Sequence, residues 1–192
     1  FDSNNRELVK LKPIIEEINA REEKLKKFKD RDFAKQTKDL QERFAEGQSL
    51  DLLLPESFAL VREASRRAIG LRHFDVQLYA AAVLAGGKIA EQKTGEGKTL
   101  SAIPALFLHS LTKKGVHLVT VNDYLARRDA GWMGPIFDLL GVSVASIINN
   151  QSFFYDPSFV DEKTHDYRLK HLRPVSRKEA YQADIVYGIN SE

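Results

Sequence analysis

Cysteine is absent from this chain of 192 residues, which also has a single methionine and a single tryptophan. Without cysteine there can be no disulfide framework, thiolate zinc site or cysteine nucleophile. The most apolar stretch, about residues 78–87, is far shorter than the ~20 residues that a helix needs to cross a bilayer. The five histidines are scattered without acidic partners at metal-ligand spacing, so we assign no metal site built by the protein alone.

An excess of charge of one sign is also missing. Lysine and arginine number 29 against 27 aspartates and glutamates, which leaves a net charge of +2. This balance argues against a nucleic-acid coat or a polybasic membrane protein, so we expect no nucleic-acid partner and only a local anion site. With 43% hydrophobic residues the chain can bury a sizeable core, which excludes disorder as its main state.

The two ends of the sequence predict that it is a piece of a longer protein. The first residue is Phe rather than Met, no basic and apolar leader follows it, and the last residues come directly after a strand-like run. Residues 1–50 form an expected N-terminal helical arm. Almost half of residues 1–47 are charged, apolar residues recur at helical spacing, and Pro13 and Gly47 favour two or three helices rather than one rod. We expect most of these charges to be solvated.

Residues 51–192 have the pattern of an α/β domain. A helix beginning at Pro55 and ending at Gly70 is followed by alternating strands and helices. The further helices are expected at residues 74–84, 98–111 and 124–140, and the strands at 88–92, 116–121, 142–148 and 183–187. Apolar strands separated by helices indicate a parallel sheet covered on both faces.

Residues 149–177 are too long for an ordinary loop of such a fold, and we interpret them as an insertion. Its first part carries the aromatic residues Phe153, Phe154, Tyr155 and Phe159. They either form a patch for a partner or hold the insertion against its own domain, and the second alternative is the more ordinary one.

The strongest motif is TGEGKT, residues 94–99, between an expected strand and an expected helix. Glycines at 95 and 97 allow successive backbone N–H groups to point at phosphate oxygens, and the following helix adds its positive end. Lys98 would reach the β and γ phosphates, and Thr99 would offer its hydroxyl to Mg²⁺. The motif lacks the first glycine of the strict P-loop pattern, since Gln92 stands there, but it fits the TGxGKT form.

Three other positions are weaker candidates. Gln77 could offer a donor and an acceptor to an adenine edge, although a glutamine at a helix start is usually an ordinary surface residue. Asn122 or Asp123 can cap the helix that follows a strand and carries Arg127 and Arg128. Ligands bind at the carboxyl ends of strands in α/β sheets, so the two arginines could contact a ligand there. The alternative is an ordinary capped helix whose arginines are solvated. We expect His73 to be structural.

Four blocks in order carry a resemblance to a known family: VREASRRAIGLRHFDVQL, IAEQKTGEGKTL, GVHLVTVNDYLARRDAGWM and YQADIVYGINSE. Together they resemble the first nucleotide-binding domain of the SecA family, the ATPase motors of bacterial protein export. The resemblance covers about residues 1–148 and 176–192. It implies a RecA-like P-loop NTPase fold, here with an incomplete sheet, that binds ATP and Mg²⁺.

The resemblance also assigns roles and partners. Gln77 matches the residue that contacts adenine. The phosphate cradle of the family is matched by Thr94, Gly95, Glu96 and Gly97. Lys98 matches the phosphate lysine, with a catalytic role in charge stabilisation, and Thr99 matches the magnesium ligand. The implied partners are the SecYEG channel, preproteins and acidic lipids, and the implied location is the cytoplasm and the cytoplasmic face of the cell membrane. Three features depart from the family pattern: Gln92, the ending YGINSE and the insertion.

The resemblance leaves three further expectations. Because the chain ends before the family's acidic motif and second motor domain, we expect weak nucleotide binding and negligible hydrolysis. An incomplete sheet would expose an edge and favour self-association. A DEAD-type helicase domain and a non-catalytic interaction module are the alternatives. The first is disfavoured because TVNDYLA stands at residues 120–126, where a helicase would have a Pro-Thr-Arg-Glu-Leu run.

Overall fold

The computed structural model describes residues 3–191, with side chains from residue 5 onward. The chain divides into two compact units between residues 111 and 112, and each is described here by itself. The first unit is helical and the second contains the sheet. None of the helices in the described residues has the length and apolar character required to cross a membrane.

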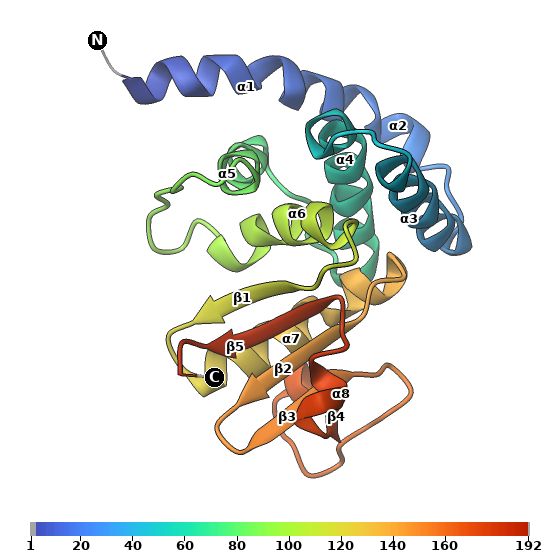
Figure 1. Ribbon diagram of the computed structural model, residues 1–192, viewed down its shortest axis with the longest axis vertical. Helices are drawn as coiled ribbons and strands as arrows, with labels where there is room; N and C mark the ends of the chain where they lie inside the picture. The colour runs from blue at the N-terminus through green and yellow to red at the C-terminus, as the bar shows by residue number, and fades with distance from the viewer. Residues whose placement is uncertain (1–2, 192) are drawn as a thin grey trace. The chain divides into compact units, whose positions relative to one another are not determined.

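The N-terminal arm consists of three helices, which confirms the expected two or three. They are α1 (Ser3–Ala20), α2 (Glu22–Leu25) and α3 (Asp30–Ala45). Pro13 lies inside α1 and does not divide it. All three helices pack against α4 (Leu50–Ile69), as Figure 1 shows. The apolar faces of α1 and α3 are fully buried at Ile18, Phe33 and Leu40, and this burial holds the arm against the rest of the first unit.

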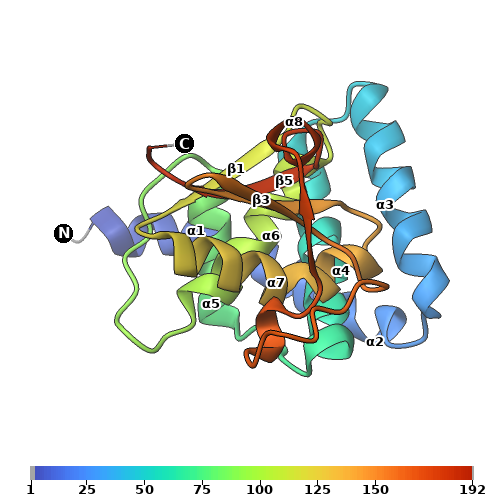
Figure 2. The ribbon, with the colours of Figure 1, turned by 90° about the horizontal axis from the view of Figure 1, so that it is seen from below.

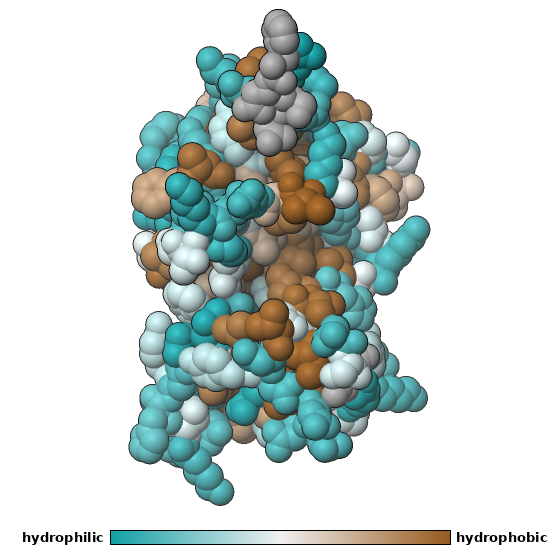
Figure 3. All heavy atoms as spheres, turned by 90° about the vertical axis from the view of Figure 1, so that its left-hand side faces the viewer, coloured by the Kyte–Doolittle hydropathy of each residue, from teal (hydrophilic) through white to brown (hydrophobic). Residues whose placement is uncertain are grey.

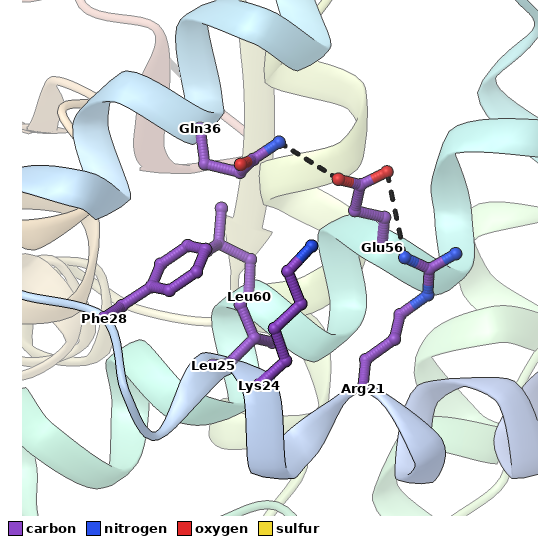
Figure 4. Close-up of a pocket in the computed structure, with 7 residues that line it drawn as sticks. All are labelled: Arg21, Lys24, Leu25, Phe28, Gln36, Glu56 and Leu60. Carbon is purple, nitrogen blue, oxygen red and sulfur yellow. Dashed lines mark hydrogen bonds and ion pairs between the residues drawn. The ribbon is translucent and has the colours of Figure 1, made fainter.

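Glu56 of α4 joins the parts of the arm (Figure 4). It accepts a hydrogen bond of 3.0 Å from Gln36 of α3 and lies 4.0 Å from the guanidinium of Arg21, which precedes α2. Below these groups is a pocket of about 20 Å³, whose apolar lining includes Leu25 and Leu60. This volume is close to that of one water molecule and is too small for an organic ligand.

The predicted start of α4 at Pro55 is wrong, because the helix begins five residues earlier. Ser49 caps it by accepting a hydrogen bond from the backbone N–H of Leu52, and Pro55 is accommodated inside the helix. The predicted end is confirmed, since Gly70 adopts a left-handed φ of +73° there. Two helices follow, α5 (Asp75–Ala85) and α6 (Lys98–Ser110), which pack against each other, and α6 also packs against α4.

The predicted strand at residues 88–92 does not form. These residues are irregular, and the side chain of Ile89 is 96% exposed. A strand needs a neighbouring strand for its backbone hydrogen bonds, and the described part of the first unit is entirely helical outside its loops and turns.

The second unit has a sheet of five strands in the order β1-β5-β2-β3-β4. Their bounds are β1 (Val116–Thr120), β2 (Val144–Ile148), β3 (Gln151–Tyr155), β4 (Leu172–Val175) and β5 (Ile185–Ile189). β5 pairs in parallel with β1 and β2, so the α/β class and a parallel core are confirmed. Figure 2 shows α7 (Asp123–Leu139) and the short α8 (Arg177–Ala180) on opposite faces of this sheet.

The sheet is mixed rather than wholly parallel, because the predicted insertion contributes β3 and β4. Both are antiparallel to their neighbours, and a 3₁₀ turn, η1 (Tyr167–Leu169), lies between them. Residues 149–150 form the two-residue turn from β2 to β3, where Asn150 has a φ of +60°. Asparagine tolerates this left-handed conformation better than most residues, so the turn was encoded locally.

The aromatic residues of this segment hold it to its own unit. The ring of Tyr155 packs so closely on Gly134 of α7 that a Cβ there would overlap it. The guanidinium of Arg127 lies 4.5 Å from the ring centroid of Phe153. Phe154, on the other face, packs against a buried apolar cluster that includes Ile147 and Val186. Packing within the unit, rather than a partner patch, therefore accounts for these three aromatic residues.

Candidate functional site

The loop at residues 94–99 leads directly into α6 in the first unit. Gly95 and Gly97 have φ values of +91° and +81°, and α6 begins at Lys98. Residues with a Cβ rarely adopt such φ values, so the two glycines are required by the path of the backbone. The loop and the first turn of α6 thus have the geometry that the TGEGKT motif predicts.

The N-terminus of α6 has no side-chain cap and no acidic residue in its first turn. By contrast, α4 is capped by Ser49 and α7 by Asn122, whose Oδ1 accepts a 2.9 Å hydrogen bond from the N–H of Leu125. Backbone N–H groups at an uncapped helix start need acceptors from elsewhere, and the helix dipole makes an anion the favoured acceptor. The chemistry of this donor set fits a phosphate group.

The charged side chains of the loop are held by Lys93. The ammonium of Lys98 is exposed and donates a 2.8 Å hydrogen bond to the carbonyl of Lys93. The carboxylate of Glu96 accepts a 2.7 Å hydrogen bond from the N–H of Lys93. Thr94 is exposed in the preceding turn, whereas Thr99 is half-buried in the first turn of α6. An anion in the loop would therefore compete with a backbone carbonyl for Lys98.

Gln77 lies against the same loop and is buried, with 6% of its surface exposed. Its Oε1 accepts a 3.0 Å hydrogen bond from the N–H of Phe74, which caps α5. Its Nε2 donates a 3.1 Å hydrogen bond to the carbonyl of Glu96. The tertiary structure thus brings Gln77 together with residues 96 and 97, and it is not the exposed residue that its position alone would suggest.

His73 is fully buried beside the first turn of α6. Its Nε2 carries the proton and donates a 2.9 Å hydrogen bond to the carbonyl of Leu100, since a carbonyl can only accept. Burial lowers the pKa of His73 to about 4, and the charges of Arg62 and Arg72 act in the same direction. The neutral ring fixes α6 to the segment before α5, which agrees with the expected structural role.

Two features of this region have no signal in the motif itself. The side chains of Phe74 and Val76, on either side of Asp75, are each 69% exposed although both are apolar. Figure 3 shows apolar side chains reaching the surface among hydrophilic ones. Gln92, the departure from the P-loop pattern, donates a 3.0 Å hydrogen bond to Ser101, which in turn donates to the carbonyl of Gly97. Gln92 is therefore linked through Ser101 to the backbone of the loop at Gly97.

The candidate arginines of the second unit are engaged in local packing. Asn122 caps α7 as expected. Arg128 forms an ion pair of 2.6 Å with Asp129, and Arg127 stacks on Phe153. The ordinary alternative of a capped helix is confirmed, but the two arginines pack on protein groups rather than pointing freely into solvent. Within residues 3–191, no group of three or more histidine and acidic side chains could hold a metal ion.

Comparison with known proteins places this geometry in a family. The family model for the SecA DEAD-like domain matches residues 1–192. The protein translocase subunit SecA of Chloroflexus aggregans is 54% identical over all of this chain, which covers 20% of that protein. The SecA of Thermodesulfovibrio yellowstonii is 52% identical over 98% of the chain and 21% of its own length. The SecA of Carboxydothermus hydrogenoformans is 49% identical over all of the chain and 20% of its own length.

The chain thus spans about a fifth of the length of the curated relatives it matches. The matched residues include the phosphate-loop motif at 94–99. On this evidence, the chain belongs to the SecA DEAD-like domain family.

Proposed function

We propose that this chain binds ATP with Mg²⁺ at residues 94–99. The observation that carries the proposal is the uncapped N-terminus of α6 behind a loop with two left-handed glycines. The backbone N–H groups of the loop would hold the phosphates, Lys98 would neutralise their charge and stabilise the charge that develops during transfer, and Thr99 would ligate Mg²⁺. Bound ATP supplies a phosphoanhydride bond whose cleavage can drive a conformational change.

Gln77 keeps the capacity to contact the adenine base. Its amide has two N–H donors and two acceptor lone pairs, and the contacts with Phe74 and Glu96 use one of each. The remaining donor and acceptor match an adenine edge. The exposed ring of Phe74 offers an apolar surface for the base next to it.

For the longer protein, we propose a motor that couples ATP hydrolysis to the movement of unfolded preproteins through the SecYEG channel. It would work in the cytoplasm and on the cytoplasmic face of the cell membrane, with acidic lipids as a further partner. Residues 1–50 would be its N-terminal arm and residues 51–192 the first part of its first nucleotide-binding domain. The relatives named above, each a protein translocase subunit SecA, support this assignment.

We expect the 192 residues alone to bind nucleotide weakly and to hydrolyse it negligibly. The sequence has one Asp-Glu pair, Asp161-Glu162, and it lies in the irregular connection between β3 and β4. There the carboxylate of Asp161 accepts a 3.0 Å hydrogen bond from the N–H of Lys163, a local turn contact.

Thermal unfolding with increasing Mg-ATP or Mg-ADP tests the proposal. Saturation at about 100 times Kd adds roughly 2.7 kcal/mol, which raises Tm by about 2–4 °C per kcal/mol for a chain of this size. Lys98→Ala should abolish the shift, whereas Lys35→Ala, an exposed lysine of α3, should keep it. Equal shifts in the unaltered chain and Lys98→Ala would place binding elsewhere, and the lack of any shift would rule out a usable site in these residues.

A further inference from the structure

The segment 72–77 is tied to the phosphate loop and to α6. It connects α4 to the first turn of α5. From it, Gln77 donates to the carbonyl of Glu96 and His73 donates to the carbonyl of Leu100. Both acceptors are backbone carbonyls, one in the phosphate loop and the other in the first turn of α6. A displacement of the segment would therefore break one buried and one partly buried hydrogen bond that hold the loop and α6 in place.

The N-terminal arm holds the same segment from its other side. Glu22 of α2 accepts two hydrogen bonds from Arg72, at 2.9 and 2.6 Å, in a paired geometry. Asn19 of α1 donates a 3.1 Å hydrogen bond to Asp75. Arg72 holds the pKa of Glu22 at about 2, so this carboxylate is ionised at neutral pH. The paired arginine–carboxylate contact is the strongest geometry available to such groups, and it fixes orientation as well as distance.

Arg62 of α4 lies at the centre of these contacts and is 2% exposed. It donates a 2.5 Å hydrogen bond to Asp75 and another to Asn19, and it lies 3.6 Å from Glu22. A buried guanidinium is costly once its partners leave, because its charge is then neither paired nor hydrated. Withdrawal of Asn19 and Glu22, or of Asp75, from Arg62 would therefore carry this cost.

A second contact joins the arm to the chain ahead of the phosphate loop. Glu7 of α1 forms an ion pair with Lys88, the first residue of the irregular segment that leads to the loop. This pair is exposed, so it contributes less than the contacts of the buried Arg62. Both contacts nevertheless hold chain that comes before the phosphate loop, one at residues 72–75 and the other at residue 88.

We propose that Arg62 and Arg72 are positioning residues through which the docked N-terminal arm and the nucleotide site stabilise each other. Asn19 and Glu22 orient the two arginines and Asp75, and these hold segment 72–77 so that Gln77 and His73 meet the loop and α6. Thermodynamic linkage then requires the effect to be reciprocal: arm docking strengthens nucleotide binding, and nucleotide strengthens arm docking. This inference rests on the proposed nucleotide site.

The test compares Glu22→Gln with Glu23→Gln in the 192-residue chain. Glu23 is a matched control, because it is the neighbouring residue, is 81% exposed and pairs with Lys26 at 2.7 Å on the surface. Two quantities are measured: the Kd for Mg-ADP, at a temperature where every variant is folded, and amide hydrogen exchange of residues 17–26 with and without Mg-ADP. Coupling changes the Kd and the effect of Mg-ADP on exchange, whereas a merely structural role would lower the stability of Glu22→Gln without changing the Kd or that effect.

We expect Glu22→Gln to raise the Kd by about fivefold or more, the usual lower range for such coupling, and Glu23→Gln to leave it unchanged. Mg-ADP should slow exchange of residues 17–26 in the unaltered chain and not in Glu22→Gln. An unchanged Kd in Glu22→Gln would overturn the inference while leaving the nucleotide site standing. Failure of the unaltered chain to bind Mg-ADP would overturn both. If Glu22→Gln does not fold, Glu22→Asp, which keeps the charge but shortens the reach, is judged by the same comparison.

Discussion

The side-chain amide of Gln77 donates a hydrogen bond of 3.1 Å to the backbone carbonyl of Glu96, which lies 19 residues further along the chain. This contact joins the first turn of α5 to the phosphate loop. Because the other end of the same amide accepts from the N–H of Phe74, one buried side chain satisfies two backbone groups. Helix start and loop thus depend on one residue for their mutual position.

Replacing Gln77 with Met removes both hydrogen bonds and keeps nearly the same volume. The N–H of Phe74 and the carbonyl of Glu96 then lose their partners, and each unpaired group costs about 1–3 kcal/mol if it stays out of water. We expect urea unfolding to show a loss of stability in this range, with weaker binding of Mg-ADP. Gln182→Met, at an exposed position of the second unit, should change neither quantity. A Gln77→Met chain as stable as the unaltered one would refute the double role.

Gly97→Ala should disturb the loop in two ways. A Cβ at residue 97 would lie 2.5 Å from Nε2 of Gln77, and the φ of +81° is itself unfavourable for alanine. Gly70→Ala separates the two effects, because Gly70 has a φ of +73° but no atom within 4 Å of the added Cβ. Backbone strain of about 1 kcal/mol or more is expected in both variants. Only Gly97→Ala should also lose nucleotide binding, and equal losses of binding in the two variants would contradict this.

His73 should make the stability of the chain depend on pH between about 6.5 and 4. Its pKa in the folded protein is lowered to about 4 from an ordinary value of 6.5, chiefly by burial. Above pH 6.5 the ring is neutral in both the folded and unfolded states, and its contribution is fully present. As the pH falls, the unfolded chain takes up the proton first, so stability is lost progressively until the folded pKa is reached.

His73→Gln keeps a side-chain N–H donor but cannot titrate in this range. Denaturant unfolding at a series of pH values should therefore show a smaller loss of stability between pH 6.5 and 4.5 for this variant. Below about pH 4, both proteins should lose stability together, because the pKa of Glu22 is lowered to about 2 and its ionised form is favoured in the folded chain. Identical slopes above pH 4.5 would show that His73 is not the group responsible.

The exposed edge of the sheet should promote self-association. β1 lies at one end of the strand order, and Val119 in it is 62% exposed. An unpaired strand with exposed apolar residues is a template for pairing with a second copy, and a lysine there opposes it. Sedimentation velocity should show association of the unaltered chain and its reduction in Val119→Lys, but not in Val160→Lys, which is 46% exposed in a loop. A monodisperse unaltered chain would contradict the prediction.

The sequence allowed the helices α5, α6 and α7 and the strands of the parallel core to be placed within a few residues. The largest errors concern strands, and each has a physical cause. Residues 88–92 were predicted as a strand from their local composition, but a strand exists only where a second one accepts its hydrogen bonds. The reverse error occurred at residues 151–155, which were predicted as part of an insertion without a strand, whereas they pair with β2 and β4.

Some features of the candidate site could be predicted from the sequence and others could not. The phosphate loop could be predicted because its chemistry is local: two glycines, a lysine and a threonine within six residues set the backbone path and begin a helix. The contact of Gln77 with Glu96, the burial of His73 and the network around Arg62 could not be predicted, since they join residues that are far apart in sequence.

Local sequence therefore specifies the elements whose hydrogen bonds close within a few residues, including the helix that begins at Lys98 and the loop before it. Which of these elements meet depends on the folded chain as a whole, which places Glu22 against Arg72 and extends the sheet with β3 beside β2. The reason is that burial of apolar surface selects among distant pairings by the summed fit of the whole chain, and no short segment carries that information.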